Sequence, residues 1–497
     1  MKRPLIIFIL FVCLFTVALF SQNLVFFGNL SGRVFPENSP EKRSCFSGLS
    51  EYLSKKANND YIFIDLGNSF YGSTQSVYYL VNEPENFYEP ISDLYNSYSI
   101  IKCIGERDLY VEELLDGLNL YSCNILSEDA HIKRYLTADN GRIVFIPISI
   151  VRKNLVFDNF KVFDPFESLK EIIDLFDNDE SKDKIIIVGI SNDESTDVFS
   201  ILDRLDDRVD LVIFESDLSG VFDINGKKVL ALSGNDLLSL KVNGNNIEYS
   251  FEPLFNPSIS PFEPKINEMS NWLNRELAVF AYKPRDYGFN GLNPVNTVAE
   301  FLTNIFEGSS VHSIPLIAFE DQNTNQKIRI KDVIKLLNHG TLFESTISGK
   351  DVEKILNDLI EEGTTFEIGN VNYIAQIDET NKTIKWLKYR GHEISKRSSF
   401  ELITNVPTLD DLKFKVATKK LWNVLKQKRT SMKYVKNWYI INKPFEKEFR
   451  YYVVDWGDNI GTLALVFNKD AKLLMDMNGL KKPRELKAGD VLIIPMF

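Results

Sequence analysis

The stretch Tyr452-Val-Val-Asp-Trp-Gly457-Asp-Asn-Ile460, near the C-terminal end of the chain, joins a short strand pattern to a turn and the start of a helix. Two helical patterns follow, at Ile460–Phe467 and Ala471–Asn478, and an apolar run closes the segment at Val491–Pro495. Roughly fifty residues in this β–α–α–β order suffice for a small core but not for an active-site cleft. The segment is therefore expected to be a small binding module.

This segment resembles the LysM family across its whole length. The family's opening, middle and closing motifs correspond to Tyr452-x-Val454-x-x-Gly457-Asp458-Asn459-Ile460, Asn478-x-Leu480 and Leu486-x-x-Gly489-Asp490-x-Leu492-x-Ile494-Pro495. The resemblance implies binding to glycans that contain N-acetylglucosamine, in bacteria usually peptidoglycan. It places the groove in two loops, whose glycan-binding residues would be Gly457, Asp458, Asn459, Ile460, Met477, Asn478 and Leu480.

Exposed backbone amides in these loops would bond N-acetyl groups while apolar side chains pack on sugar faces. A purely structural role is the better account of Gly457, Leu492 and Ile494. For Asp458, Asn459 and Ile460 the two roles stay open.

The N-terminus has the pattern of an export signal, with Lys2 and Arg3 before an apolar run from Leu5 to Phe20. This run of about 16 residues is shorter than the roughly 20 that a membrane span needs, so we predict cleavage after Ser21. Retention as a membrane anchor is the alternative. No later segment is apolar enough to span a bilayer, so we expect an exported protein of the periplasm or cell wall.

The composition limits the partners and the redox chemistry. A net charge of −12 over 497 residues argues against a nucleic-acid partner, which requires clustered Lys and Arg. The cysteines that remain after cleavage are Cys45, Cys103 and Cys123. Three buried thiols are expected, and a disulfide between Cys103 and Cys123 is the alternative.

Short apolar strands alternate with helices from residue 22 to residue 257, which is typical of an α/β domain. The expected strands are Leu24–Phe27, Tyr61–Asp65, Ile100–Ile104, Arg142–Ile148, Lys184–Ile190, Val209–Phe214 and Lys228–Leu232. Helices are expected at Arg43–Lys56 and Ser168–Phe176. The proline-containing stretch Asn256–Pro264 marks the end of this domain.

A second α/β domain is predicted from residue 258 to residue 426. It begins with an amphipathic helix at Pro264–Leu277, and its other expected elements are helices at Asn296–Phe306, Ile330–Leu337 and Lys350–Glu361 and a hairpin of Tyr373–Ile377 with Thr383–Tyr389. A basic stretch, Lys419–Lys436, overlaps its end. A solvated linker helix is expected for this stretch, and a patch that contacts the cell wall or a membrane surface is the alternative. A basic linker is predicted from 427 to 449, before the final module at 450–497.

The first domain resembles the calcineurin-like metallophosphoesterases, specifically their 5′-nucleotidase branch. The motifs that carry this resemblance are Asn29-Leu-Ser31-Gly32-Arg33, Asp65-x-Gly67-Asn68-x-x-x-Gly72-Ser73, Gly105-Glu106-Arg107-Asp108 and Val209–Leu218. The resemblance implies an α/β sandwich whose loops bind two metal ions that activate water. The second domain resembles the C-terminal substrate domain of the same enzymes through Asn296–Leu302, Ile328–Val333 and Ile347–Val352.

The residues at the family's metal positions are not metal ligands of the expected kind. These positions hold Asn29, Ser31, Asn68, Glu106, Arg107, Ser191, Ser216 and Leu218. Neutral amides and hydroxyls do not hold two divalent ions against water. The first domain also contains a single histidine, His131. We therefore predict no metal and no cofactor.

The substrate domain departs from its family in the same way. Ile317–Glu320 replaces the phosphate-contacting motif, Asn338-His339 replaces a Pro-Phe pair, and Thr365 replaces one stacking aromatic residue. Phe414 remains as an aromatic candidate for stacking a base, although core packing is the preferred role for it.

The first hypothesis is an envelope protein that binds peptidoglycan and carries a 5′-nucleotidase-like scaffold without catalysis. The second is an active 5′-nucleotidase with atypical ligands, for example a single-metal site of Asp65, Glu106 and Asp108. The third is a nucleotide-binding sensor without catalysis.

Overall fold

The structure is a computed structural model, and two compact units, residues 1–269 and 270–497, are described separately. It describes residues 23–35, 45–56, 61–177, 184–192, 198–216, 218–224, 226–243, 246–254, 265–280, 296–307, 313–319, 325, 327–337, 341–362, 364, 366–368, 373–378, 383–389, 392–393, 398–407, 412–432, 440–441, 449–454, 457–478, 480, 482–487 and 490–495. The predicted export signal, the boundary at 256–264, and the positions Glu320, Asn338, His339 and Thr365 lie outside these ranges.

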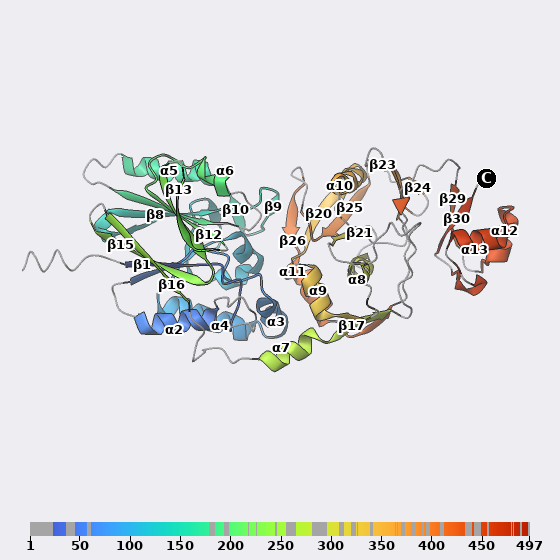
Figure 1. The fold of residues 1–497 in the computed structure, drawn as a ribbon, viewed down its shortest axis with the longest axis horizontal. Coiled ribbons are helices and arrows are strands. Elements are labelled where there is room, and N and C mark those ends of the chain that lie inside the picture. Colours follow the sequence, from blue (N-terminus) through green and yellow to red (C-terminus); the bar gives the residue numbers. More distant parts are fainter. Residues whose placement is uncertain are drawn as a thin grey trace, which may run out of the picture. The chain divides into compact units, whose positions relative to one another are not determined.

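Two β-sheets form the centre of the first unit (Figure 1). The seven-stranded sheet has the order β16 (Asn246–Pro253), β15 (Asp236–Asn243), β1 (Asn23–Phe27), β2 (Tyr61–Asp65), β3 (Ile101–Cys103), β4 (Asn119–Tyr121) and β6 (Ile132–Lys133). The six-stranded sheet has the order β13 (Gly220–Ile224), β14 (Lys227–Ser233), β12 (Leu211–Ser216), β11 (Ile185–Ser191), β8 (Ile143–Ser149) and β7 (Leu136–Ala138).

Side chains that alternate along these strands divide between two cores, because successive residues of a strand point to opposite faces of the sheet. One core contains side chains from both sheets, among them Phe26, Ile64, Phe145 and Ile213, so the sheets pack face to face. The other lies on the outer face of the six-stranded sheet and is typified by Ile146, Ile186, Val188 and Val212.

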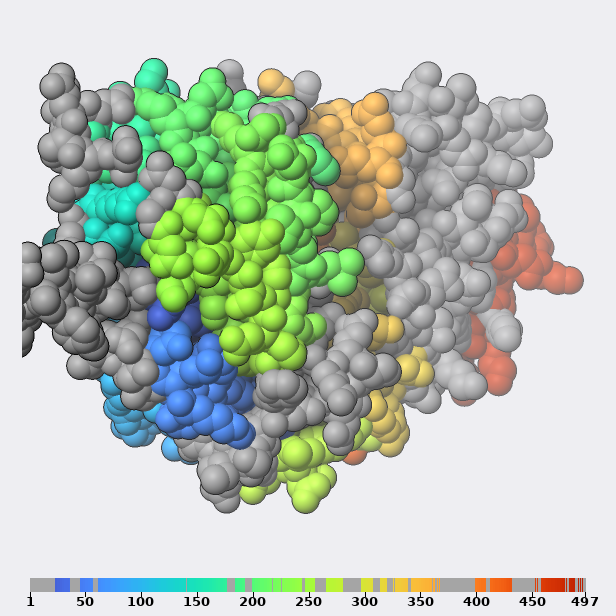
Figure 2. Space-filling view, turned by 60° about the vertical axis from the view of Figure 1, so that its left-hand side comes forward, coloured from blue at the N-terminus to red at the C-terminus, as the bar shows by residue number. Residues whose placement is uncertain are grey.

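Helices cover the outer faces of both sheets (Figure 1). The second core includes apolar residues of α5 (Pro165–Asp177) and α6 (Val198–Leu202). In Figure 1, α2 (Phe46–Lys56), α3 (Thr74–Asn82) and α4 (Glu85–Ser97) lie on the opposite side of the unit, beside the seven-stranded sheet. Figure 2 shows a face of this unit formed by the green and yellow-green β13–β16 region, with blue α2 below it. The predicted α/β sandwich is confirmed.

Most strand predictions in the first unit agree with the structure to within one or two residues. The predicted strand Tyr61–Asp65 is correct at both ends. The runs predicted at Arg142–Ile148 and Val209–Phe214 form β8 and β12, each shifted toward its C-terminal side. Side chains at the carboxyl ends of the parallel strands β1, β2 and β3 therefore meet at one edge of the sheet.

The second unit corrects two predictions. The amphipathic helix expected at Pro264–Leu277 is shorter, because α7 spans Ile266–Leu273 and residues 276–280 form strand β17 (Glu276–Phe280). The predicted linker at 427–449 includes β27 (Thr430–Met432), which pairs in parallel with β17. The basic stretch before it forms α11 (Thr418–Lys426), whose Trp422 and Leu425 are buried, so this part is packed rather than solvated.

The remaining elements of the second unit follow the predicted order. A mixed sheet contains β21 (Phe366–Ile368), β18 (Ser313–Ala318), β25 (Ser399–Thr404), β20 (Phe343–Ser348) and β26 (Phe414–Val416) as consecutive neighbours. The helices are α8 (Thr297–Glu307), α9 (Ile330–Leu336) and α10 (Gly349–Glu361), and β19 (Lys327–Arg329) pairs with β17. The predicted hairpin is present as β22 (Tyr373–Asp378) and β23 (Thr383–Tyr389), flanked by β28 (Ile440–Ile441) and β24 (His392–Glu393).

The C-terminal segment has the predicted β–α–α–β order and a core of its own. Strand β29 (Phe449–Val453) pairs antiparallel with β30 (Val491–Pro495), and α12 (Ile460–Val466) and α13 (Ala471–Met477) lie between them in sequence. The core residues are Val454, Ile460, Leu463, Ala464, Leu474, Leu480, Leu492 and Ile494. Within the described ranges, no helix combines the length and apolarity that a bilayer crossing requires.

All three described cysteines are buried free thiols, as predicted. Burial raises the pKa of Cys45 and of Cys103, and it raises the pKa of Cys123 to about 12. The thiolate is the reactive form, so these side chains are chemically inert.

Gly189 tests the packing between the sheets. A Cβ on this residue of β11 would lie 2.6 Å from the ring of Phe145. Because overpacking a tight core destabilises, Gly189→Ala should lower the unfolding free energy of the first unit by about 1 to 3 kcal/mol. Gly220→Ala is the control, since its Cβ would meet only the exposed ring of Phe222 at 3.2 Å. Scanning calorimetry that finds equal effects of the two variants would contradict this packing.

Candidate functional site

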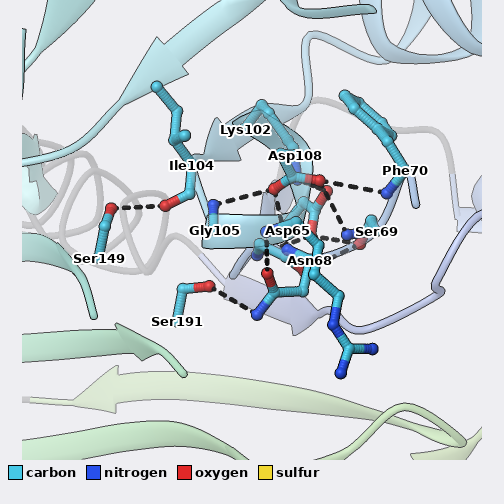
Figure 3. Close-up of polar contacts among 12 residues, drawn as sticks. Asp65, Asn68, Ser69, Phe70, Lys102, Ile104, Gly105, Asp108, Ser149 and Ser191 are labelled. Carbon is cyan, nitrogen blue, oxygen red and sulfur yellow. Dashed lines mark hydrogen bonds and ion pairs between the residues drawn. The ribbon is translucent and has the colours of Figure 1, made fainter. Parts of the chain in front are cut away.

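Asn68 joins the loops that follow several strands of the first unit (Figure 3). Its Nδ2 donates to Ser191 Oγ at 3.2 Å, to the Asn192 carbonyl at 3.0 Å and to Glu215 Oε2 at 2.8 Å. Its Oδ1 accepts from the backbone N–H of Arg107 at 3.0 Å. One amide side chain therefore connects the carboxyl ends of β2, β3, β11 and β12.

The approach of these loops requires glycine at position 105. A Cβ there would lie 2.4 Å from Asn68 Oδ1 and 2.5 Å from Ser191 Oγ. Those separations are shorter than any stable contact of a carbon atom, so a side chain would push the loops apart.

Three of the predicted positions have left-handed backbone conformations. The φ angles of Asn29, Ser31 and Asn68 are 51°, 52° and 50°. Residues other than glycine adopt this conformation only when the surroundings impose it, and such strain clusters at functional sites. Here the imposing contacts are backbone hydrogen bonds, from Asn29 N to the Gly67 carbonyl and from Ser31 N to the Asn68 carbonyl. The loops therefore have left-handed backbone at three positions that the sequence resemblance assigns to a metal site.

Behind these loops lies a fully buried ion network (Figure 3). Lys102 Nζ, on β3, lies 2.9 Å from Asp65 Oδ2 and 2.7 Å from Asp108 Oδ2, and none of the three side chains is exposed. Asp108 also accepts the backbone N–H groups of Asn68, Gly105, Ser69 and Phe70, at 2.9 to 3.1 Å. Asp65 accepts from Gly67 N, Ser69 Oγ and Tyr95 Oη, at 2.6 to 3.0 Å.

The ionisation of this network follows from burial and mutual attraction. Burial lowers the pKa of Lys102, but the nearby carboxylates of Asp108 and Asp65 outweigh burial and leave that pKa raised. Burial raises the pKa of Asp65 in spite of the attraction of Lys102. Lys102 is therefore held as an ammonium ion.

Glu106 is the one carboxylate at a predicted metal position, and it is hydrogen-bonded to neighbouring side chains. Its Oε1 accepts from Tyr110 Oη at 2.5 Å and from Arg152 Nε at 2.8 Å, and its Oε2 accepts from Arg152 N at 2.8 Å. Arg152 also makes an ion pair with it. Glu106 is 1% exposed, so this pairing takes place in a low-dielectric setting.

Glu215 is a site residue that the sequence patterns did not reveal. It ends β12 next to Ser216, and burial raises its pKa to about 8. Its Oε2 accepts from Asn68, whereas its buried Oε1 has no hydrogen-bond partner among the described residues and faces Gly28. The signal that could have revealed it is a carboxylate directly after the apolar run Val209–Phe214 of a central strand, where a charge is rarely tolerated.

The predicted positions thus fall into three groups. Asn29, Ser31, Asn68, Arg107 and Ser191 are linked through the loop contacts described above. Leu218 lies at the surface with 78% of its area exposed, and Ser216 Oγ accepts from the Leu218 N–H at 3.5 Å. Glu106 is directed to Arg152.

These residues do not fit a pair of divalent ions. The carboxylates of Asp65, Glu106 and Asp108 accept hydrogen bonds from protein donors and are paired with cations of the chain itself. The other positions offer an amide, a hydroxyl or an aliphatic side chain, which are poor ligands for divalent metals. In the described part of the chain, no three His, Cys, Asp or Glu side chains gather in a way that could hold a metal ion.

In the C-terminal module, several predicted glycan-binding side chains have internal partners. Asp458 Oδ2 accepts from Tyr452 Oη at 2.8 Å, and Asn459 caps α12 by accepting from Thr462 N at 3.0 Å. Asn478 is buried and donates to the Leu474 carbonyl at 2.7 Å. Ile460 and Leu480 belong to the core.

Some residues of the two loops are accessible to solvent. Gly457 is exposed and has a φ of 95°, and a Cβ on it would meet no described atom within 4 Å. Asn459 is also exposed, and Met477 is half-buried. Phe414 in the other part of the second unit is 1% exposed and packs in the core, as preferred from the sequence.

The C-terminal module matches a family model described as the LysM domain over residues 452–495. No curated protein matches the chain.

Solved structures similar to the chain include a 5′-nucleotidase of Staphylococcus aureus in complex with α-ketoglutarate, at 13% identity. That match covers 77% of this chain and 89% of the other, with a TM-score of 0.54. A 5′-nucleotidase precursor of Thermus thermophilus has 13% identity, covers 86% and 100% of the two chains and has a TM-score of 0.47. The NAD nucleotidase of Haemophilus influenzae has 12% identity, with 82% and 91% covered and a TM-score of 0.45.

Identity this low establishes shared architecture and leaves the chemistry to the residues of each site. The chain carries a LysM domain at residues 452–495, and the region before it has the fold of the 5′-nucleotidases.

Proposed function

We propose that this chain is an exported envelope protein that binds peptidoglycan, or a related N-acetylglucosamine glycan, through its LysM domain. The 5′-nucleotidase-like region acts as a scaffold without catalysis. The observation that carries the proposal is a complete LysM domain in a chain whose nucleotidase-like fold has one carboxylate at the predicted metal positions, that of Glu106, already paired with Arg152. The N-terminal pattern of Lys2, Arg3 and an apolar run supports export to the periplasm or cell wall.

The exposed residues Gly457 and Asn459 and the half-buried residues Asp458 and Met477 are available to a sugar chain. The internal hydrogen bonds of Asp458, Asn459 and Asn478 hold both loops in shape. A preformed loop loses little conformational entropy on binding, which favours affinity. We therefore assign a positioning role to the side chains of Asp458, Asn459 and Asn478. The contacts with sugar are assigned to backbone amide groups of the loops and to the side chain of Met477.

The absence of catalysis is supported by the charge state of the site. Metal-assisted hydrolysis needs ligands that stay anionic and free to coordinate. Asp65 and Asp108 face Lys102, Glu106 faces Arg152, and Glu215 is protonated at neutral pH because its pKa is about 8.

An active 5′-nucleotidase with atypical ligands is the second candidate. One observation favours it, namely the buried Oε1 of Glu215, which lacks a hydrogen-bond partner among the described residues beside Asn68. A metal ion bound there would have to displace the proton of Glu215.

Deletion of the residues after Lys447 should abolish co-sedimentation of the chain with purified peptidoglycan, because it removes the LysM domain. Within the intact chain, Met477→Ser should weaken binding about tenfold, the loss expected for one apolar contact with a sugar face. Leu473→Ser on the same helix is the matched control and should bind as the parent does. Sedimentation that survives the deletion would move binding to the other domains.

Purified protein should contain substoichiometric divalent metal and should not hydrolyse 5′-AMP or a generic phosphodiester above the rate in buffer. Addition of Mn²⁺ or Zn²⁺ should not change this, since the carboxylates already have cationic partners. Elemental analysis and a phosphate-release assay measure both. Stoichiometric metal together with turnover that Glu106→Ala abolishes would refute the scaffold assignment.

The free energy of unfolding of the first unit should fall as pH rises from about 4.5 to about 8. Over this range Glu215 has lost its proton in the unfolded chain but keeps it in the folded protein, so a rise in pH favours the unfolded chain. Its contribution is fully present below pH 4.5 and is lost as pH passes the folded-state value. Glu215→Gln removes this titration, so its stability relative to the parent should increase by about 3 kcal/mol between pH 4.5 and pH 7.

Hydrogen exchange of β12 peptides measures this difference. The exposed Glu128, which pairs with Lys161 at the surface, provides the control substitution Glu128→Gln. A Glu215→Gln variant whose pH profile stays parallel to that of the parent would show that Glu215 is ionised in the folded protein.

A further inference from the structure

Lys102 is unusual because it places a full positive charge inside the first unit with no access to water. Its side chain is 0% exposed, and Nζ lies 4.4 Å from the centre of the Phe70 ring in addition to its two carboxylate partners. Lysine is rarely buried unless it is paired. The function of this ammonium ion therefore follows from its two partners, the carboxylates of Asp65 and Asp108.

The two carboxylates bound by Lys102 organise different loops. Asp65 holds the turn at Gly67 and Ser69 and the Tyr95 hydroxyl of α4. Asp108 holds the backbone of Asn68–Phe70 and of Gly105. These loops carry Asn68 and Arg107, two of the positions that the sequence resemblance assigns to a metal site.

Without a cation, these two buried carboxylates would repel each other in a low-dielectric environment. One would have to take up a proton, and a protonated carboxyl group is a weaker acceptor for the backbone N–H groups. The ammonium ion thus permits two anionic acceptors to order adjacent loops. Bound metal ions can also neutralise carboxylates that order loops, but here the cation is a side chain of the protein.

We propose that Lys102 is the resident cation of this loop cluster, so that the loops are ordered without a bound metal ion. A truncated side chain at this position would leave a niche that selects a small primary ammonium ion. The proposal shares with the proposed function the premise that no metal pair is bound, but it concerns how the loops are held.

Scanning calorimetry of the full chain tests the proposal. The signal to follow is the unfolding transition of the first unit, which is identified as the transition whose Tm Gly189→Ala lowers. Lys102→Ala should lower the Tm of this transition by roughly 10 °C, as expected for an uncompensated buried charge. Ethylammonium chloride should restore a large part of the shift, whereas tetramethylammonium chloride at the same ionic strength should not. Equal effects of the two salts would overturn the assignment of an ammonium niche.

A double-mutant cycle keeps the proposal testable if Lys102→Ala fails to fold. Lys102→Met alone should lower the Tm strongly, and Lys102→Met combined with Asp65→Asn should recover most of that loss, because one unpaired carboxylate has been removed. Additive effects would overturn the proposal. A Tm of the parent that rises on addition of Mn²⁺ or falls with a chelator would overturn it as well.

These outcomes are separable from those of the proposed function. Additivity in the cycle, together with metal-free protein and no hydrolysis, would remove the role of Lys102 and leave the scaffold assignment intact. Metal-dependent hydrolysis together with strong coupling in the cycle would refute the scaffold assignment. Lys102 would then still pair with the two carboxylates, but it would not take the place of a bound metal ion.

Discussion

The carboxylate of Asp108 is the group on which the loop cluster depends. It accepts four backbone N–H groups from two loops and faces the ammonium ion of Lys102. These donors replace water around a carboxylate that is fully buried. The left-handed backbone at Asn68 is held in part because Asp108 accepts from the N–H groups of Asn68 and of the two residues that follow it. The position of Asn68 in turn determines where Ser191, Arg107 and Glu215 meet.

In the first unit, the shape of the loop cluster and the chemistry of its side chains depend on different groups. The left-handed conformations at Asn29 and Ser31 are accompanied by backbone hydrogen bonds to Gly67 and Asn68, which do not depend on the identity of the Asn29 and Ser31 side chains. Metal binding depends chiefly on the charge and donor atoms of the side chains. The two properties can therefore diverge, and similarity of architecture is a weak guide to activity in this chain.

Sequence patterns predicted the strands well where burial on both faces leaves long apolar runs, as at Tyr61–Asp65 and around Ile143–Ser149. They were wrong at Glu276–Phe280, since a short apolar run next to an amphipathic helix has no period of its own to mark the change. In the site, the residue types at Asn68 and Leu218 were enough to predict that neither supplies an anionic ligand. The roles of Lys102 and Glu215 were not, because they arise from groups distant in sequence, such as Asp65 with Lys102 and Asn68 with Glu215.

The buried thiols have a consequence for where this protein can be made. Cys45, Cys103 and Cys123 have no disulfide partner in the described part of the chain, and burial keeps each of them in the unreactive protonated form. Oxidants and disulfide catalysts act on accessible thiolates, so they have nothing to act on at these positions once the chain is folded. The native state is thus the same in an oxidising and in a reducing compartment. Its vulnerable interval is the time before folding, and rapid burial of these three side chains is what protects the product from wrong cross-links.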